Sequence, residues 1–333
     1  MRSFTYTRPA TVREAIAAHV EAGEGARYIA GGTTLYDLMK LGVEAPAHLV
    51  DVSAIEGLGS IETGGETLRF GAMALMADVA ADPGLRERAP ILSEALRKAA
   101  SQQLRNMATV GGALLQRTRC MYFRNGDRGL YPCNKRAPGA GCAALGGLDR
   151  GQALLGWSEA CSAVSPGDWP VALVALDASV EVEGPAGRRV LPIADLYRLP
   201  EETPHLEFAL HPAEIITAIT APATAASRRS TYHKLRDRES YAFALVSAGV
   251  ALEMEGDVVR EARIALGGVA TTPWRAHGAE ASLAGAVLTR ERALEAGREA
   301  FVGARPGRRN AFKIPLGADV VADALMIAAG RTP

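Results

Sequence analysis

The amino-acid sequence predicts a fold of mixed helices and strands in two or three domains, interrupted by one irregular segment. The 333 residues are 48% hydrophobic and 22% charged, which is enough to bury a sizeable core. Strand-like and helix-like segments alternate in the first part of the chain, and paired glycines stand at two of the junctions. All four cysteines fall in one stretch that has neither pattern. Lys plus Arg and Asp plus Glu both number 37, so the net charge gives no indication of binding to nucleic acid.

Short elements alternate along the first part of the chain. Apolar spacing and flanking glycines predict, in order, a helix at 11–20 with Thr11 as its N-cap, a strand at 27–30, a helix at 33–41, strands at 48–52 and 68–72, and a helix at 91–100. Residues 116–162 are rich in Arg, Gly, Pro and Cys and have no sustained apolar period. We interpret them as an insertion that something other than a hydrophobic core must order.

Regular structure is expected again in the second half. The predicted elements are ordered structure over 171–183, a β-hairpin of 243–253 and 258–269 about a turn at Gly256 and Asp257, and helices at 290–303 and 318–329. The small residues and proline of 221–227 indicate a linker, and we place a domain boundary there. Nowhere does an apolar run approach the roughly 18 residues of a membrane span.

Two glycine pairs are candidate phosphate sites. Gly31 and Gly32 stand between a predicted strand and a predicted helix. Free backbone N–H groups and the positive end of the helix dipole would therefore face one point, and the hydroxyls of Thr33 and Thr34 could add hydrogen bonds. The plain structural alternative is a tight turn with an N-cap.

A second segment repeats this chemistry. Thr109, Gly111 and Gly112 form another expected glycine turn, and two such turns could hold one dinucleotide from both sides. Neither segment fits GxGxxG and the chain contains no GxxxxGK[ST], so Rossmann and P-loop binding both lose support. A different dinucleotide-binding fold is required.

Four stretches resemble, in chain order, motifs of one known family. Residues 29–35 (IAGGTTL) are similar to the pyrophosphate loop in the FAD subunits of the xanthine dehydrogenase and carbon monoxide dehydrogenase family, and 105–112 (RNMATVGG) to its second motif. Residues 166–168 (PGD) resemble its flavin-side aspartate motif, and 234–244 the start of its C-terminal domain. The resemblance covers nearly the whole chain.

What the resemblance implies is an α+β chain. A two-lobed FAD-binding fold of the vanillyl-alcohol oxidase (PCMH) type would occupy 1–222, with lobes at 1–55 and 56–222 and a cysteine-bearing insertion at 117–162. A C-terminal β-sheet and helix domain of the carbon monoxide dehydrogenase flavoprotein type would follow at 228–331. FAD would be bound without a covalent link. The residues assigned to it are Ile29, Ala30, Gly31, Gly32, Thr33, Thr34, Leu35, Thr109, Gly111, Gly112, Asp168, Ile216 and Lys234.

One position departs from the family pattern. Ala113 stands where relatives often carry Asn, Ser or His, so a side-chain hydrogen bond near the flavin is expected to be missing. The grip of the backbone on the pyrophosphate should survive this change.

The cysteines Cys120, Cys133, Cys142 and Cys161 follow the spacing C-x12-C-x8-C-x18-C. Four thiolates can ligate a 4Fe–4S cluster or a structural zinc, and either would order a loop that lacks a core. Unrelated buried thiols are the third alternative. Basic residues in the segment could offset the negative charge of a thiolate-ligated cluster, although they could equally be solvated loop charges. They are Arg117, Arg119, Arg124, Arg128, Lys135 and Arg136.

The resemblance extends to this segment and favours the cluster over zinc. "QRTRC-x-YFR" and "CNKR-x-PG-x-GC" are similar to the insertion in the FAD subunits of bacterial periplasmic aldehyde oxidoreductases, which carry a 4Fe–4S cluster. We expect the flavin site, built from separate turns, to keep its cofactor when this cluster is lost.

The function implied is electron transfer within a molybdenum-dependent aldehyde oxidoreductase, an oxidoreductase complex. A large molybdopterin-binding subunit would oxidise the aldehyde, and a small subunit with 2Fe–2S centres would relay electrons to FAD and on to an external acceptor. The rival hypotheses are a standalone FAD-dependent oxidase and a zinc-stapled assembly module. None of the six histidines lies in a recognised flavin-attachment motif, and we expect each to be structural or at the surface. The sequence alone indicates a cytoplasmic protein, whereas the resemblance implies export to the periplasm together with a signal-bearing partner.

Overall fold

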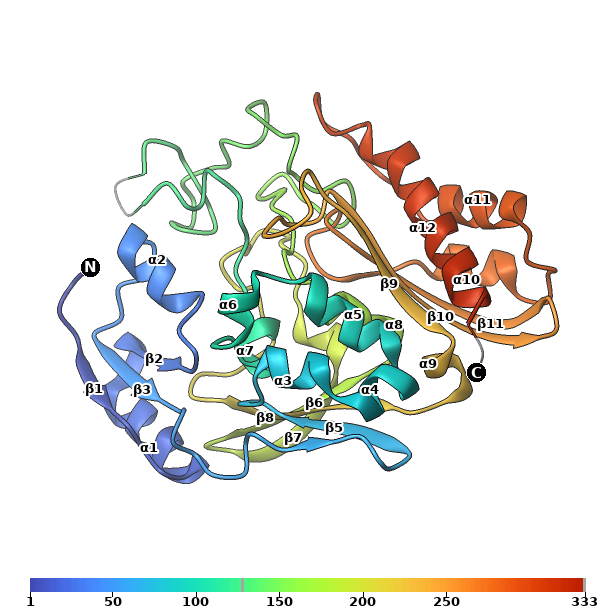
Figure 1. Ribbon diagram of the computed structural model, residues 1–333. Helices are drawn as coiled ribbons and strands as arrows, with labels where there is room; N and C mark the ends of the chain where they lie inside the picture. Colours follow the sequence, from blue (N-terminus) through green and yellow to red (C-terminus); the bar gives the residue numbers. More distant parts are fainter. Residues whose placement is uncertain (127–128, 332–333) are drawn as a thin grey trace.

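A computed structural model describes residues 1–126 and 129–331, and Figure 1 shows the layers that they build. Arg128, counted among the basic residues of the insertion, lies outside the described residues. At the N-terminal end, a parallel three-stranded sheet has the order β1-β3-β2. Its elements are β1 (Thr5–Thr7), α1 (Val12–Ala22), the 3-10 turn η1 (Gly23–Gly25), β2 (Ala26–Ile29), α2 (Leu35–Leu41) and β3 (His48–Asp51).

A five-stranded antiparallel sheet of order β4-β5-β8-β6-β7 forms the second layer. Its strands are β4 (Ile61–Glu62), β5 (Thr67–Gly71), β6 (Ser179–Gly184), β7 (Gly187–Pro192) and β8 (Ile215–Pro222), with the 3-10 turn η2 (Ile193–Leu196) after β7. Strands β5 and β8 are neighbours in the sheet although residues 72–214, which include the helices and the insertion, lie between them in the sequence.

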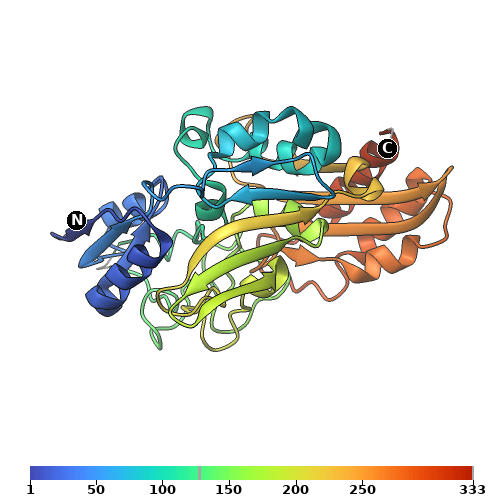
Figure 2. The ribbon, with the colours of Figure 1, turned by 90° about the horizontal axis from the view of Figure 1, so that it is seen from below.

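Short helices cover one face of this sheet. They are α3 (Met76–Ala81), α4 (Pro83–Arg88), α5 (Pro90–Lys98), α6 (Gln102–Arg105), α7 (Val110–Leu114) and α8 (Trp169–Ala175). The main hydrophobic core joins the sheet to these helices and includes the edge-to-face pair of Phe70 and Trp169, whose ring centroids are 5.7 Å apart. Figure 2 shows the five-stranded sheet from below, with the helical layer beside it.

A four-stranded antiparallel sheet of order β12-β11-β10-β9 lies on the other side of α5 and α8. Its strands are β9 (Ser230–Leu235), β10 (Val246–Glu255), β11 (Val258–Gly267) and β12 (Trp274–Arg275). On its far face pack α10 (His277–Leu283), α11 (Arg290–Glu299) and α12 (Lys313–Ala329), as Figure 1 shows. No helix in the described ranges is long and apolar enough to cross a membrane.

The sequence predicts the locally determined elements correctly. Thr11 caps α1 in a capping box with Glu14, whose backbone N–H donates to Thr11 Oγ1 at 3.2 Å. The hairpin turn at Gly256 and Asp257 is confirmed: β10 pairs with β11 directly across it, and Gly256 has a φ of 57°. The expected insertion is likewise irregular, since the described part of 116–162 contains no helix or strand beyond isolated bridges.

The linker predicted at 221–227 is not a loose connection. Strand β8 continues to Pro222, and a short helix, α9 (Ala225–Arg228), follows with Thr224 as its N-cap. Ser227 is fully buried, and its hydroxyl donates to the carbonyl oxygen of Arg88 at 2.7 Å. Small residues serve close packing here, a role that composition alone does not separate from flexibility.

Candidate functional site

The first glycine segment joins β2 to α2. Gly32 has a φ of 71°, a left-handed conformation that glycine adopts without the steric cost of a Cβ. In the described structure Thr34, the N-cap of α2, makes no side-chain hydrogen bond to the first turn of the helix. The backbone N–H of Tyr36 in that turn donates to the carbonyl oxygen of Gly32 at 3.0 Å, and no side-chain cap occupies the other N–H groups of the turn.

The second glycine segment starts a helix, whereas the sequence predicted a turn. Thr109 is the N-cap of α7, and its Oγ1 accepts a hydrogen bond from the backbone N–H of Gly112 at 3.1 Å. Gly111 is buried, and a Cβ there would meet Ala72 at 2.7 Å. Its backbone N–H donates to the carbonyl oxygen of Ala72 at 2.9 Å. Gly111 therefore lets α7 pack closely on the chain just after β5.

The two segments touch each other. The carbonyl oxygen of Met107 occupies the space that a Cβ on Gly31 would need. Gly31 is consequently required for the backbones to approach. The two glycine segments thus form adjoining walls of one site.

A cleft of about 1080 Å³ opens between these walls. This volume exceeds the roughly 300–1,000 Å³ of ordinary small-molecule sites and suits a dinucleotide. All the residues assigned to FAD from the sequence line it, namely those from Ile29 to Leu35 together with Thr109, Gly111, Gly112, Asp168, Ile216 and Lys234. Ala113, the departure from the family pattern, lines it as well.

A buried ion pair closes one side of the cleft. Lys234 Nζ lies 2.8 Å from Asp168 Oδ2, with both side chains almost wholly buried, and it also donates to the carbonyl oxygen of Lys98 at 3.0 Å. The Tyr232 hydroxyl donates to Asp168 Oδ1 at 2.6 Å. Burial raises the pKa of the Asp168 carboxyl, and the ammonium group and the hydroxyl oppose that rise. Asp168 therefore holds Lys234 in place at the wall of the cleft.

Several lining residues were not assigned from the sequence. Met107, Tyr241 and Phe243 line the cleft and are exposed, and Arg119 stacks on the Phe243 ring at 4.9 Å. Tyr241 and Ala100 have positive φ values of 53° and 48°. Non-glycine residues in this conformation cluster at functional sites. The sequence signal was present, because Tyr241 and Phe243 belong to a motif quoted above.

All four cysteines line one small cavity within the insertion. Cys133 and Cys142 face each other in a β-bridge. The backbone N–H of Ala163 donates to Cys161 Sγ at 3.4 Å, and the Gln152 side-chain amide donates to Cys120 Sγ at 3.5 Å. Burial raises the pKa of the Cys120 thiol, and it raises the pKa of Cys161 to about 11. Over 1–126 and 129–331, no three His, Cys, Asp or Glu side chains are placed to hold a single metal ion.

Most of the basic residues of the insertion that the structure describes bind carboxylates, which partly neutralise the positive charge expected near the cysteines. Arg119 and Arg124 both bind the carboxylate of Asp37. Arg117 binds Glu44 and Glu207. Arg136 donates to the carbonyl oxygens of Tyr122, Phe123 and Tyr131.

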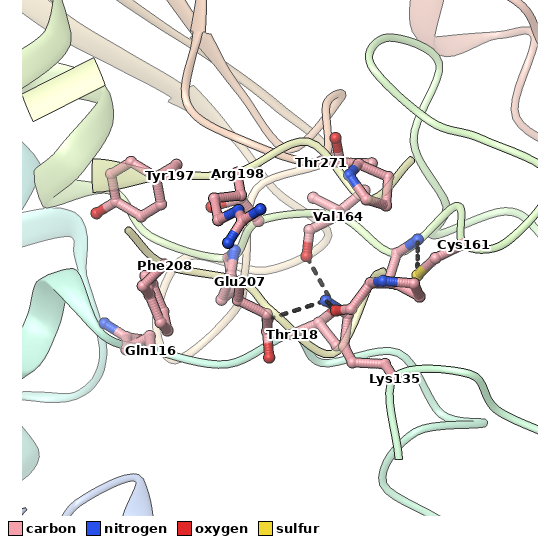
Figure 3. Close-up of a pocket in the computed structure, with 15 residues that line it drawn as sticks. Gln116, Thr118, Lys135, Cys161, Val164, Tyr197, Arg198, Glu207, Phe208 and Thr271 are labelled. Carbon is pink, nitrogen blue, oxygen red and sulfur yellow. Dashed lines mark hydrogen bonds and ion pairs between the residues drawn. The ribbon is translucent and has the colours of Figure 1, made fainter. Parts of the chain in front are cut away.

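Glu207 links the cleft to the cysteine cavity. Its carboxylate lies 2.6 Å from Arg117 Nε and 3.1 Å from Lys135 Nζ, and Lys135 lowers the pKa of Cys161 against the stronger effect of burial. Figure 3 shows the small pocket between the two sites, with Glu207, Lys135 and Cys161 on its walls. His205, expected from the sequence to be structural or at the surface, lines the cleft.

Two family models match the chain. Residues 2–224 match the FAD binding domain in molybdopterin dehydrogenase, and 230–317 match the CO dehydrogenase flavoprotein C-terminal domain. The chain therefore belongs to the family of FAD-binding subunits of molybdopterin dehydrogenases, which are oxidoreductases.

Individual relatives agree with this assignment. The chain is 46% identical to the aldehyde oxidoreductase FAD-binding subunit PaoB of Escherichia coli K12, over 98% of both chains. It is 30% identical to the carbon monoxide dehydrogenase medium chain of Hydrogenophaga pseudoflava, over 90% of this chain and 86% of the relative. The solved carbon monoxide dehydrogenase of that organism superposes with a TM-score of 0.77 at 28% identity and covers 100% of this chain and 99% of its own. The mixed α+β fold predicted from the sequence is confirmed.

Proposed function

We propose that the protein is the FAD- and 4Fe–4S-containing electron-transfer subunit of a molybdenum-dependent aldehyde oxidoreductase. In this role it passes electrons from the 2Fe–2S centres of a small partner subunit to an external acceptor, while a large molybdopterin-binding partner oxidises the aldehyde. The observation that carries the proposal is the single cleft in which both glycine segments and the Asp168–Lys234 pair meet. The full-length similarity to an aldehyde oxidoreductase subunit supports the choice of substrate class.

The cleft has the groups that FAD requires. The start of α2, which has no side-chain cap, and the glycine backbone at Gly31 and Gly32 suit the negatively charged pyrophosphate. Bound FAD would take up electrons one at a time from iron–sulfur centres and could hold two of them for an external acceptor. Lys234, fixed by Asp168, would stabilise the negative charge that collects on the ring.

The cysteine cavity has the donor set of an iron–sulfur cluster. Four thiols surround one small space, and N–H groups donate to at least two of the sulfurs. Such hydrogen bonds are common around thiolate-ligated clusters and help to set their potentials. Because burial raises the pKa of Cys120 and Cys161, a bound metal would favour the thiolate forms that the protein alone disfavours.

Partners of two kinds are proposed. The similar proteins are described as subunits or as medium chains, which supports assembly of this chain with a larger and a smaller subunit. The oxidation of the aldehyde would lie with the large partner, since the cleft described above suits a dinucleotide.

Cofactor analysis of the full chain tests this proposal. We expect one FAD and about four irons with four acid-labile sulfides per chain in anaerobically prepared protein. In Cys133→Ser the iron should be lost selectively relative to a Ser93→Ala control, because oxygen is a harder ligand than thiolate. One zinc and no sulfide would overturn the cluster and favour an assembly module. Flavin without iron, together with aldehyde oxidation by the molybdenum-free chain, would favour a standalone oxidase.

A further inference from the structure

Helix α2, which follows the first glycine segment, rests on the cysteine insertion. Leu38 of α2 is buried in a small hydrophobic cluster with Phe123 and Cys133, and Cys120 and Val43 pack at its edge. Figure 1 shows α2 beside the insertion and apart from the helical layer α3 to α8. One cysteine, Cys133, therefore belongs to the cluster that holds α2, and a second, Cys120, packs against it.

Ion pairs reinforce this contact. Asp37 of α2 accepts from Arg119 Nη1 at 3.1 Å and also binds Arg124. Glu44, just after α2, binds Arg117, whose guanidinium stacks on the Phe123 ring at 4.6 Å. Each of these pairs joins α2 or its exit to the insertion.

The insertion itself is held by few apolar residues. Leu154 and Leu155, near its end, pack into the C-terminal core, whereas the part closer to the Leu38 cluster has polar contacts such as the Arg136 guanidinium, which ties the chain at Tyr122 and Phe123 to Tyr131. A metal bound at the cysteines would crosslink this segment and stabilise its fold. Helix α2, which follows the first glycine segment, is thus in direct contact with the cysteine segment, and the expectation that the flavin site keeps FAD without the cluster stays a prediction.

We propose that the cysteine insertion is the structural support of the FAD site, with Asp37 and Phe123 as positioning residues for the first glycine segment. This inference rests on the proposed function, because it assumes FAD in the cleft and a metal cluster at the cysteines. It makes FAD affinity depend on the state of the insertion. By linkage, bound FAD must strengthen the retention of iron by the same factor.

Two variants of the full chain test the support. Asp37→Asn removes the charge that both arginines bind, and Phe123→Ala removes the ring beneath Leu38. We expect each to raise the Kd for FAD by about 5-fold or more, the lower end of typical coupling between sites, while iron and sulfide stay bound in Asp37→Asn. Asp78→Asn is the matched control, since Asp78 is exposed on a different helix. Flavin fluorescence during titration gives the Kd.

Because coupling between two sites is reciprocal, the effect of FAD on iron retention gives a second measurement, which a purely local defect would not change. Iron remaining after equilibration with a chelator should increase when FAD is added to the wild-type chain, and Asp37→Asn should reduce that increase. An unchanged Kd for FAD in both variants, or iron retention that does not respond to FAD, would overturn the inference. Wild-type protein that contains no flavin or no iron would instead overturn the proposed function, so the two failures are distinguishable.

Discussion

The carbonyl oxygen of Met107 lies where a Cβ on Gly31 would have to be, so the two glycine segments of the cleft are in direct backbone contact. Gly32 differs, because the nearest atom to a Cβ there is the flexible Ile29 side chain at 3.5 Å. Its requirement for glycine comes from its φ of 71°. Glycine is thus required at these two adjacent positions for different physical reasons.

Gly31→Ala should therefore push the two walls of the cleft apart. Overpacking of this kind costs about 1–3 kcal/mol, and if the loops separate to relieve it, the Kd for FAD should rise by about 5- to 150-fold. Titration of the flavin-free chain measures this. Gly59→Ala is the control, because a Cβ there meets nothing within 4 Å. Wild-type affinity in Gly31→Ala would contradict the packing argument.

The Asp168–Lys234 ion pair should contribute to the stability of the folded chain. Lys234→Met leaves the Asp168 carboxylate buried without its cation, so the free energy of unfolding should fall by about 3–5 kcal/mol. Adding Asp168→Asn should recover most of that loss. Urea denaturation of the single and double variants gives the comparison. Arg150→Met breaks the exposed pair with Asp237 and should change the free energy by about 1 kcal/mol or less.

Sequence patterns predicted the features that neighbouring residues determine. The capping box of Thr11 and the hairpin turn at Gly256 each involve residues within a few positions, so their signals survive in a single sequence. The glycine segments were found for the same reason. The contact between the two segments was not predicted, because Gly31 and Met107 are far apart in the sequence and meet only in the folded chain.

Long-range partners account for what the sequence could not provide. The basic residues of the insertion were visible, yet their carboxylates lie far away: Asp37 is 82 residues from Arg119, and Glu207 is 90 residues from Arg117. Composition suggested charge available to a cluster, whereas the fold uses most of it in ion pairs. The prediction of a linker at 221–227 was wrong for a related reason, since Ser227 is buried and its hydroxyl donates to the carbonyl oxygen of Arg88.

The Gln152 amide should raise the potential of the proposed cluster. Its Nε2 donates to Cys120 Sγ at 3.5 Å, and a hydrogen bond to a ligand sulfur stabilises the more negative reduced state. Gln152→Leu should lower the reduction potential while iron and sulfide stay at wild-type levels. Redox titration followed by electron paramagnetic resonance measures this. Exposed Gln103→Leu is the control, and equal potentials in Gln152→Leu and wild type would contradict the assignment.

Lys313 provides a pH-dependent contribution to stability. Its side chain is buried at the start of α12, and Nζ donates to the carbonyl oxygen of Gly268 at 2.9 Å. Burial, aided by Arg150, lowers the pKa of Lys313 from 10.5 to about 8. Between these values the unfolded chain binds more protons than the folded chain, so this residue makes the free energy of unfolding rise with pH.

We expect a gain of about 2 kcal/mol from Lys313 between about pH 7.5 and about pH 9.5, at 1.36 kcal/mol per pKa unit. Lys313→Met cannot lose a proton and should lack this gain, so the wild type and the variant should diverge in pH dependence. Urea denaturation at both pH values measures the difference. Lys40→Met, a change at an exposed lysine, should keep the wild-type slope. If the free energies of unfolding of Lys313→Met and the wild type change in parallel with pH, the prediction is wrong and Lys313 stays protonated in the folded protein. In that case the Gly268 carbonyl oxygen and other polar surroundings offset the cost of burying the charge.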